Sequence, residues 1–150
     1  MDNEETAGLA FGRLSSEFIR VKVAPEQDAF RFATYAGTTG ISKVSAGATL
    51  SSGNDVLTAL ITAQNKMDED EVSPENRILY ITPTLYNLAI NVDTTKSKAV
   101  LDGFAKIVKV PQSRFYTAID LKDGTTKSEG VDETAGGFAK ATTAKDINFM

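Results

Sequence analysis

The sequence predicts a mixed α+β domain, and three stretches carry this prediction. Residues 77–81 (RILYI) are mostly β-branched, aromatic or aliphatic, and Pro74 and Pro83 bound them, which indicates a buried strand. Residues 52–67 show apolar residues at helical spacing before this strand, and residues 83–89 do so after it. A helix–strand–helix unit of this kind can bury a sheet face under two helices.

Start signals for both helices flank the strand. Ser52 and Asp55 have the spacing of a capping box, in which each side chain bonds the backbone N–H of the other residue. Thr82 offers a hydroxyl as a cap, and Pro83 suits the first helical position because its missing N–H has no partner to lose there. The pattern predicts a largely buried core of Leu60, Ile61, Ile78, Leu79, Ile81, Leu85 and Leu88.

Residues 1–36 are predicted to form one long helix kinked near Pro25, or two helices in tandem. Phe11 and Phe18 fall near one face of its first part. Pro25 lacks a backbone donor and clashes with the preceding turn, and Gly37 is the expected stop. A long helix with exposed aromatic residues at its start would need a partner surface.

The remaining stretches are shorter. Residues 37–53 are small and polar, which indicates a linker with room for one short strand. A short helix is expected within residues 93–102, and strands are expected at 106–110 and 114–121. Asp123-Gly124 is a turn signal. The chain ends on an apolar strand-like run, which we interpret as a cut through a longer protein because chain ends are usually polar.

The composition argues against several classes of function. A chain of 150 residues has the size of one domain with a substantial core. Its net charge of −4 argues against a generic nucleic-acid binder. It has no cysteine, so no thiolate is available as a nucleophile or metal ligand. It also has no histidine, which is the commonest general base and the commonest metal ligand in proteins. No apolar run reaches the ~20 residues that span a bilayer.

Motifs for catalysis are weak. Residues 67–71 (MDEDE) could bind a hard cation, but they lack the glycine and distal glutamate of a calcium loop, and we interpret them as a solvated loop. Residues 37–40 (GTTG) are not a phosphate loop, because no Lys-Ser or Lys-Thr follows. No nucleophile, base and orienting group come together. We therefore predict no enzymatic activity, no cofactor and no metal ion.

Four blocks of sequence resemble a known family. Residues 23–32 (VAPEQDAFRF) and 71–83 (EVSPENRILYITP) are similar to motifs of tailed-bacteriophage major capsid proteins. Residues 110–115 (VPQSRF) and 145–150 (KDINFM) resemble two further motifs of the same family. The blocks occur in the family's order and spread over most of the chain, although Ser73 is an insertion relative to the pattern.

The resemblance implies the Hong Kong 97-like coat-protein fold. Residues 1–36 would be the spine helix of the peripheral domain, and residues 37–145 the axial domain with a central sheet flanked by helices. Residues 146–150 would begin a peripheral-domain strand that the chain truncates. The arm and hairpin loop that clasp neighbouring subunits would precede Met1 in a longer protein.

The resemblance also implies a function. The chain would be part of a phage or prophage coat protein, made in the bacterial cytoplasm, that self-associates into pentamers and hexamers of an icosahedral shell in the virion. Mild acidity suits a wall that encloses double-stranded DNA without adhering to it. Two alternatives remain: the shell of an encapsulin-type bacterial nanocompartment, and a small α/β enzyme or nucleotide-binding module.

The expected contacts are between subunits, not with a membrane. Phe11 and Phe18 would meet parts of the peripheral domain outside this chain. A polar loop would approach a capsomer axis or else be a surface loop without contacts, and its candidate residues are Asp123, Gly124, Gly130, Gly136 and Gly137. The chain alone is expected to be a monomer or a weak oligomer, not a closed shell.

Overall fold

The computed structural model of the protein describes residues 2–41, 47–122 and 136–150. In these residues the helical elements are α1 (Asp2–Phe18), the π-helical segment η1 (Ile19–Val23), α2 (Ala24–Gly37), α3 (Gly53–Glu69), α4 (Pro83–Ile90), α5 (Thr94–Leu101) and the 3₁₀ turn η2 (Gln112–Arg114). The strands are β1 (Ile78–Ile81), β2 (Lys106–Lys109), β3 (Ile119–Lys122) and β4 (Gly137–Lys140). The predicted α+β class is confirmed.

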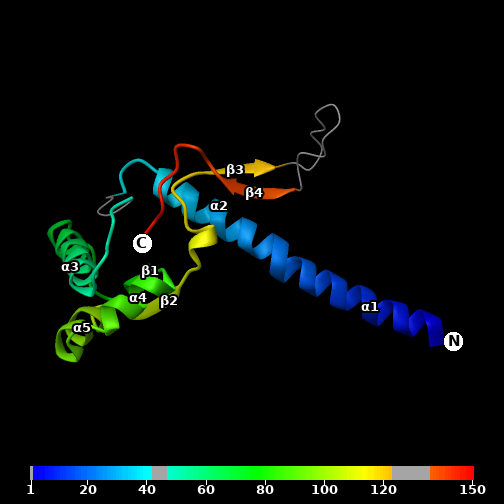
Figure 1. Cartoon of the computed structure of the whole chain (residues 1–150), viewed down its shortest axis with the longest axis horizontal. Coiled ribbons are helices and arrows are strands. Elements are labelled where there is room, and N and C mark those ends of the chain that lie inside the picture. The colour runs from blue at the N-terminus through cyan, green and yellow to red at the C-terminus, as the bar shows by residue number, and fades with distance from the viewer. Residues whose placement is uncertain (1, 42–46, 123–135) are drawn as a thin grey trace.

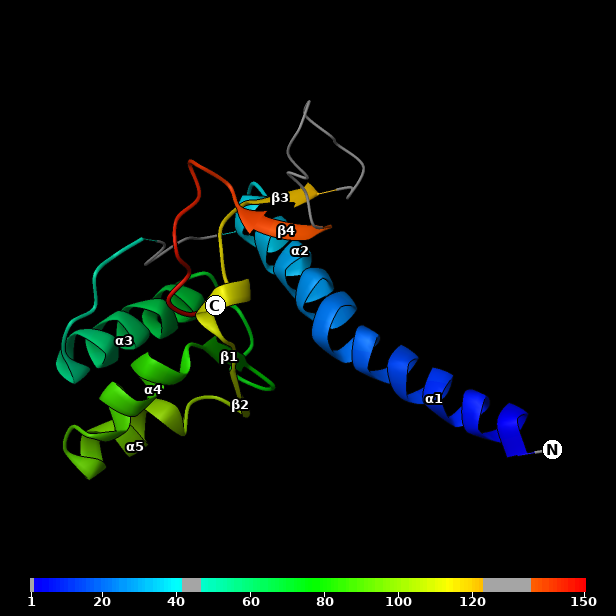
Figure 2. The same cartoon turned by 45° about the vertical axis from the view of Figure 1, so that its right-hand side comes forward.

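A body of helices and short strands carries one long projecting helix. α3, α4, α5, β1 and β2 gather at one end of the molecule (Figure 1). α1 extends away from them toward the N-terminus, and α2 continues its line and passes beside the β3–β4 hairpin (Figures 1 and 2). The C-terminus returns to the body, so the projecting helix is the main departure from a rounded shape.

β1 lies at the centre of a small mixed sheet. It pairs in parallel with β2, with Leu79 beside Ile107 and Tyr80 beside Val108. The C-terminal residues pair antiparallel with its other edge. There Tyr80 N donates to the Met150 carbonyl at 2.7 Å, and Met150 N donates to the Tyr80 carbonyl at 2.8 Å. The strand-like end of the sequence therefore joins the same sheet as β1.

One face of this sheet packs under α3, α4 and α5. The buried side chains of this larger core are Val56, Leu57, Leu60, Leu79, Ile81, Leu85, Ala89 and Val100. The predicted burial of Leu60, Leu79, Ile81 and Leu85 is therefore confirmed, and Leu88 is half-buried against them.

Two predicted core residues are exposed, and those predictions are wrong. Ile61 is 42% exposed because it follows Leu60 by one helical step of about 100° and leaves the core face. Ile78 is 46% exposed because alternation along the strand places it on the opposite side from Leu79. Of the two β1 residues on that side, Tyr80 packs against a second buried cluster and Ile78 does not.

α2 meets the second face of the sheet through one packed cluster. Phe32 from α2 packs with Val110, Phe115 and Ile147, and Tyr80 adds its ring from β1. The sheet thus packs against α3, α4 and α5 on one face, and on the other face Phe32 of α2 contacts Tyr80.

The long N-terminal helix does not break at Pro25. A kink near Pro25 or two helices in tandem were predicted. The chain is instead helical from Asp2 to Gly37, with the π-helical segment η1 ending two residues before Pro25. In η1 the Ala24 N–H donates to the Ile19 carbonyl, five residues back. A wider turn at this place accommodates the proline ring and its missing donor, which would disturb an ordinary α-helical turn.

The predicted caps are confirmed in position. Ser52 and Asp55 form the complete capping box at the start of α3, with Asp55 N donating to Ser52 Oγ at 3.2 Å and Ser52 N donating to Asp55 Oδ2 at 3.0 Å. Thr82 is the cap residue of α4, although its hydroxyl makes no capping bond. Its backbone N–H donates to the Asn148 carbonyl at 3.3 Å, so the start of α4 is tied to the C-terminal segment.

The later strands are shorter than the sequence suggests. The predicted strand at 114–121 begins only at Ile119, because η2 and an extended stretch occupy the residues before it. β3 and β4 form an antiparallel pair with Ile119 beside Lys140. The predicted Asp123-Gly124 turn lies between them, outside the described residues. No strand occurs in the part of the 37–53 linker that the structure describes.

Candidate assembly interface

α1 exposes an apolar stripe along one side. Ala7, Phe11, Leu14 and Phe18 recur at intervals of three or four residues, which places them on one face of a helix. Phe11 is 71% exposed, Leu14 67% and Phe18 58%. The two phenylalanines predicted to need a partner therefore lie on an open surface, which we call the α1 stripe.

The remaining surface of α1 is polar or carries isolated apolar residues. Glu17 Oε1 of α1 forms an ion pair of 2.6 Å with Arg20 Nη2 of η1, and both side chains are exposed. Leu9 is 69% exposed, but helical geometry places it on the side opposite the α1 stripe. The apolar surface of α1 is therefore concentrated on one face.

Within the described part of this chain, α1 has no cover over its apolar face. Most helical stability in proteins comes from packing of an apolar face against other elements. α1 has 17 residues and projects from the body, where it continues only into η1 (Figure 2). Exposed apolar surfaces of this kind mark sites of association.

A cluster of aromatic side chains fixes the direction of the projection. Phe32 of α2 meets Tyr80 with ring centroids 5.5 Å apart and Phe115 with centroids 4.8 Å apart, both edge to face. Phe115 is fully buried. Edge-to-face pairs stabilise by roughly 0.5–1.5 kcal/mol beyond the burial of area. We call this cluster, together with Ile147, the α2 junction.

An ion pair reinforces the α2 junction. Arg114 Nη1 of η2 donates to Asp28 Oδ2 of α2 at 3.0 Å. The two residues are 86 positions apart in the chain. Sequence reasoning missed this pair: both residues lie inside motif blocks and carry opposite charges, but their separation gives no indication that they meet.

The four sequence blocks with family resemblance meet at this place. The first block contributes Phe32, the second Tyr80, the third Phe115 and the fourth Ile147. The blocks are far apart in the sequence and yet form one packed cluster. Residues from these four blocks therefore attach α2 to the sheet.

The predicted loop residues are only partly described. Gly136 is exposed in a bend, and Gly137 begins β4 with a φ of 121°, a conformation that glycine adopts without a steric penalty. The other three candidates, Asp123, Gly124 and Gly130, lie outside the described residues.

The acidic run between α3 and β1 is held by basic side chains. Asp68 Oδ1 forms an ion pair of 2.6 Å with Arg77, and Asp70 Oδ1 forms one of 2.8 Å with Lys66. The partner Asp70 raises the pKa of Lys66, through a hydrogen bond and through its charge. Within residues 2–41, 47–122 and 136–150, no group of three acidic side chains is arranged to hold a metal ion.

Arg77 is a second residue whose role the sequence did not reveal. Its side chain is only 8% exposed, and Nη2 donates to Asp68 Oδ1 and to the Val72 carbonyl, each at 2.6 Å. Its Nε donates to the Ser73 carbonyl at 3.1 Å. One guanidinium therefore determines the path of the acidic loop.

Comparison of the chain with protein-family models, curated proteins and solved structures finds no match. Among the residues that the structure describes, no helix is both long and apolar enough to cross a membrane.

Proposed function

We propose that this chain is a structural protein: part of a phage or prophage major capsid protein that self-associates into capsomers of an icosahedral shell. The shell would enclose double-stranded DNA, and the protein would reside in the virion after its synthesis in the bacterial cytoplasm. Copies of the chain itself are the proposed partners.

The observation that carries the proposal is the projecting helix. α1 presents Phe11, Leu14 and Phe18 to solvent on one face of a helix that neither of the two buried cores includes. A shell subunit works through surfaces that are completed only by neighbouring copies. The α1 stripe is a surface of this kind, because no other part of the described chain packs against it.

The α2 junction gives further support. Four blocks that resemble capsid-protein motifs converge there and attach a long helix to the sheet that contains β1. The resemblance implies the same arrangement, a spine helix joined to an axial domain. A net charge of −4 suits a wall that repels the DNA it encloses.

Matched substitutions on α1 test the proposal. Leu14 and Leu9 are equally exposed leucines on opposite sides of one helix. We expect the chain to form a weak, concentration-dependent oligomer, and Leu14→Ser to weaken it while Leu9→Ser leaves it nearly unchanged. Sedimentation equilibrium over a concentration series measures both, and circular dichroism checks that the helix content is the same.

Several outcomes would count against the proposal. Equal effects of the two substitutions would mean that the α1 stripe has no special role. A chain that stays monomeric up to millimolar concentration would contradict self-association itself. A nucleotide, sugar or metal ion that stabilises the chain by more than ~2.7 kcal/mol at a hundredfold excess over its Kd would favour an enzyme or binding module instead.

A further inference from the structure

The α1 stripe has the spacing of a seam between two helices. Its members follow one another at intervals of four, three and four residues: Ala7, Phe11, Leu14 and Phe18. Alternating steps of three and four give the repeat of 3.5 residues at which one helix packs against another in a coiled coil. A strict stripe of this kind is narrower than the face with which a helix covers a globular core. The α1 stripe therefore fits a helical partner.

Side-chain size changes along this seam. Ala7 is small at one end and Phe18 is large at the other. If a second copy of α1 lies in the opposite direction, Ala7 faces Phe18 of that copy and Phe11 faces its Leu14. Larger side chains then meet smaller ones, which is how facing layers fill space. A copy in the same direction would set Phe18 against Phe18 and Ala7 against Ala7, so that one end is crowded and the other is empty.

Charge changes along the same helix. Residues 2–5 include three acidic residues and no basic one. Residues 13–22 include three basic residues and one acidic residue, Glu17, which pairs with Arg20. In the opposite direction, the acidic start of each copy lies beside Arg20 and Lys22 of the other. The same direction would bring like charges together, which is unfavourable.

The length of the projecting helix suits this arrangement. The centre of symmetry lies between Gly12 and Arg13, because Phe11 and Leu14 of the two copies face each other there. The eleven residues 2–12 on one side of this centre match the eleven residues 13–23 on the other side. Each helix start thus reaches the end of η1 of the other copy and stops before α2, the part attached to the body (Figure 2).

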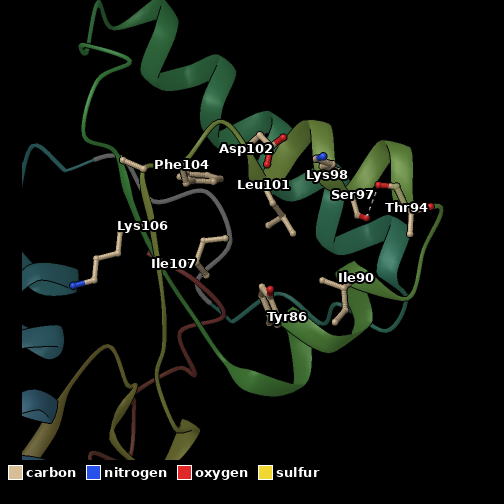
Figure 3. A pocket seen from close by; sticks show the side chains of 11 residues that line it. Tyr86, Ile90, Thr94, Ser97, Lys98, Leu101, Asp102, Phe104, Lys106 and Ile107 are labelled. Atoms are coloured by element: carbon tan, nitrogen blue, oxygen red, sulfur yellow. Dashed lines mark hydrogen bonds between the residues drawn. The ribbon is translucent and has the colours of Figure 1, made fainter.

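Another open surface lacks this self-complementarity. A groove of about 700 Å³ lies between α4, α5 and the start of β2. Lys98 and Asp102 line it with one charge of each sign, and the Lys106 side chain is directed away from it (Figure 3). The charges of the groove therefore select no partner, whereas those of α1 select a reversed copy of α1.

We propose that α1 of one copy pairs with α1 of a second copy in the opposite direction, seam against seam. The contact uses the same surface on both copies, so it closes as a pair. This inference rests on the proposed function, which assigns the α1 stripe to self-association. It adds which element of the neighbouring copy covers the stripe and in which direction that element lies.

The flanks of the seam distinguish the two directions. At 100° per residue, Gly8 and Ser15 lie on one flank of the α1 stripe, and Ala10 and Glu17 lie on the other. In a reversed pair the symmetry axis is perpendicular to the plane of the two helices, so each flank lies beside the same flank of the copy. In a parallel pair the axis runs along the helices, so each flank lies beside the opposite flank.

Engineered disulfides test the direction. The chain has no cysteine, so each variant carries a single thiol. Gly8→Cys mixed with Ser15→Cys should give a mixed dimer under glutathione exchange, because these positions are neighbours in the reversed pair. A Cβ on Gly8 meets nothing within 4 Å, so this substitution should leave the fold intact. Mass spectrometry under non-reducing conditions measures the products.

Two further mixtures are the controls. Gly8→Cys with Ala10→Cys should link only in a parallel pair. Gly8→Cys with Ser16→Cys should link in neither, because Ser16 lies on the side of α1 away from the stripe. We expect the mixture with Ser15→Cys to yield at least tenfold more mixed dimer than either control, since residues with Cα atoms more than ~7 Å apart cannot be bridged.

The other flank offers an independent pair. Ala10→Cys with Glu17→Cys should also link in the reversed arrangement, and it replaces the first pair if circular dichroism shows that a variant of that pair is unfolded.

The results separate this inference from the proposed function. If Leu14→Ser weakens association while the mixture with Ala10→Cys gives the most dimer, the direction is wrong and the α1 stripe remains the association surface. Equal yields from all three mixtures would mean random collision and would equally overturn the reversed pair. A chain that is monomeric under all conditions overturns both.

Discussion

Arg114 and Asp28 join two parts of the chain that the sequence keeps 86 residues apart, with Nη1 of the guanidinium 3.0 Å from Oδ2 of the carboxylate. The Arg114 side chain is 27% exposed and that of Asp28 is 41% exposed. Arg114 and Asp28 are close in sequence to Phe115 and Phe32, whose rings are in contact, so the ion pair and the aromatic packing both stabilise the α2 junction. Because α1 continues through η1 into α2, the direction in which α1 projects depends on the α2 junction.

A double-mutant cycle measures the ion pair. We expect Asp28→Ala and Arg114→Ala to show a coupling free energy of about 0.5–1 kcal/mol, since partly exposed pairs are screened by water. Urea denaturation gives the free energies of unfolding. The Glu17–Arg20 pair between α1 and η1 is the control, with a coupling of ~0.3 kcal/mol or less because it is more exposed. Equal couplings would mean that Arg114–Asp28 is an ordinary surface pair.

Two isoleucines of β1 provide a matched test of the larger core. The Ile81 side chain is fully buried on the face of β1 that packs against the helices, whereas Ile78 lies on the other face of the strand and is 46% exposed. Ile81→Ala should reduce the free energy of unfolding by ~2–5 kcal/mol, because it leaves a cavity. Ile78→Ala should cost less than ~1 kcal/mol, as surface changes do. Similar losses in urea denaturation would contradict the alternation of burial along β1.

Gly53 and Gly12 are helical glycines in opposite surroundings. A Cβ on Gly53 would lie 2.2 Å from Val92 Cγ2 and 2.3 Å from the Leu88 carbonyl oxygen, so no larger residue fits between α3 and α4. Gly53→Ala should therefore destabilise the protein by ~1–3 kcal/mol. A Cβ on Gly12 meets nothing within 4 Å.

Gly12→Ala should accordingly stabilise α1 by about 0.5–1 kcal/mol, because alanine loses less backbone entropy in a helix. The effect is local, so slower hydrogen exchange of α1 amides is the measurement that detects it. Faster exchange after Gly12→Ala would show that the site is not the open helical position described above.

The capping box should make stability depend on pH in the acidic range. Hydrogen bonds from Ser52, and a further one from Ser51, lower the pKa of Asp55 below its ordinary value of 3.8. The folded state therefore favours the carboxylate, and its contribution is fully present above pH 3.8 and is lost as pH falls through the lower folded pKa. Ser52→Ala should lower stability at neutral pH and reduce the loss between neutral and acidic pH.

Thermal unfolding from pH 2 to 7 measures this difference between Ser52→Ala and the unaltered chain. Thr82→Ala is the control, because the Thr82 hydroxyl makes no capping bond and its change should leave the pH profile unaltered. Parallel pH profiles for Ser52→Ala and the unaltered chain would show that Asp55 does not depend on Ser52.

Local chemistry was sufficient to predict many elements from the sequence. The Ser52–Asp55 capping box, the helical start at Pro83 and the strand before it depend on residues within a few positions of one another, so their spacing alone specifies them. The helical character of residues 1–36 was predicted for the same reason, although the prediction placed a kink or a break between two helices near Pro25. The α1 stripe could also be read from periodicity, because a helix places residues three and four apart on one face.

The tertiary structure decided which of these surfaces are covered. Ile78 and Ile81 have the same side chain and lie in the same strand, and only the packing of α3 and α4 on one face buries one of them. The Asp28–Arg114 pair and the Arg77 anchor depend on contacts between distant or irregular segments, which no local pattern encodes. Spacing along the chain fixes a residue's face on its own element, but burial and pairing depend on what the rest of the chain places opposite it.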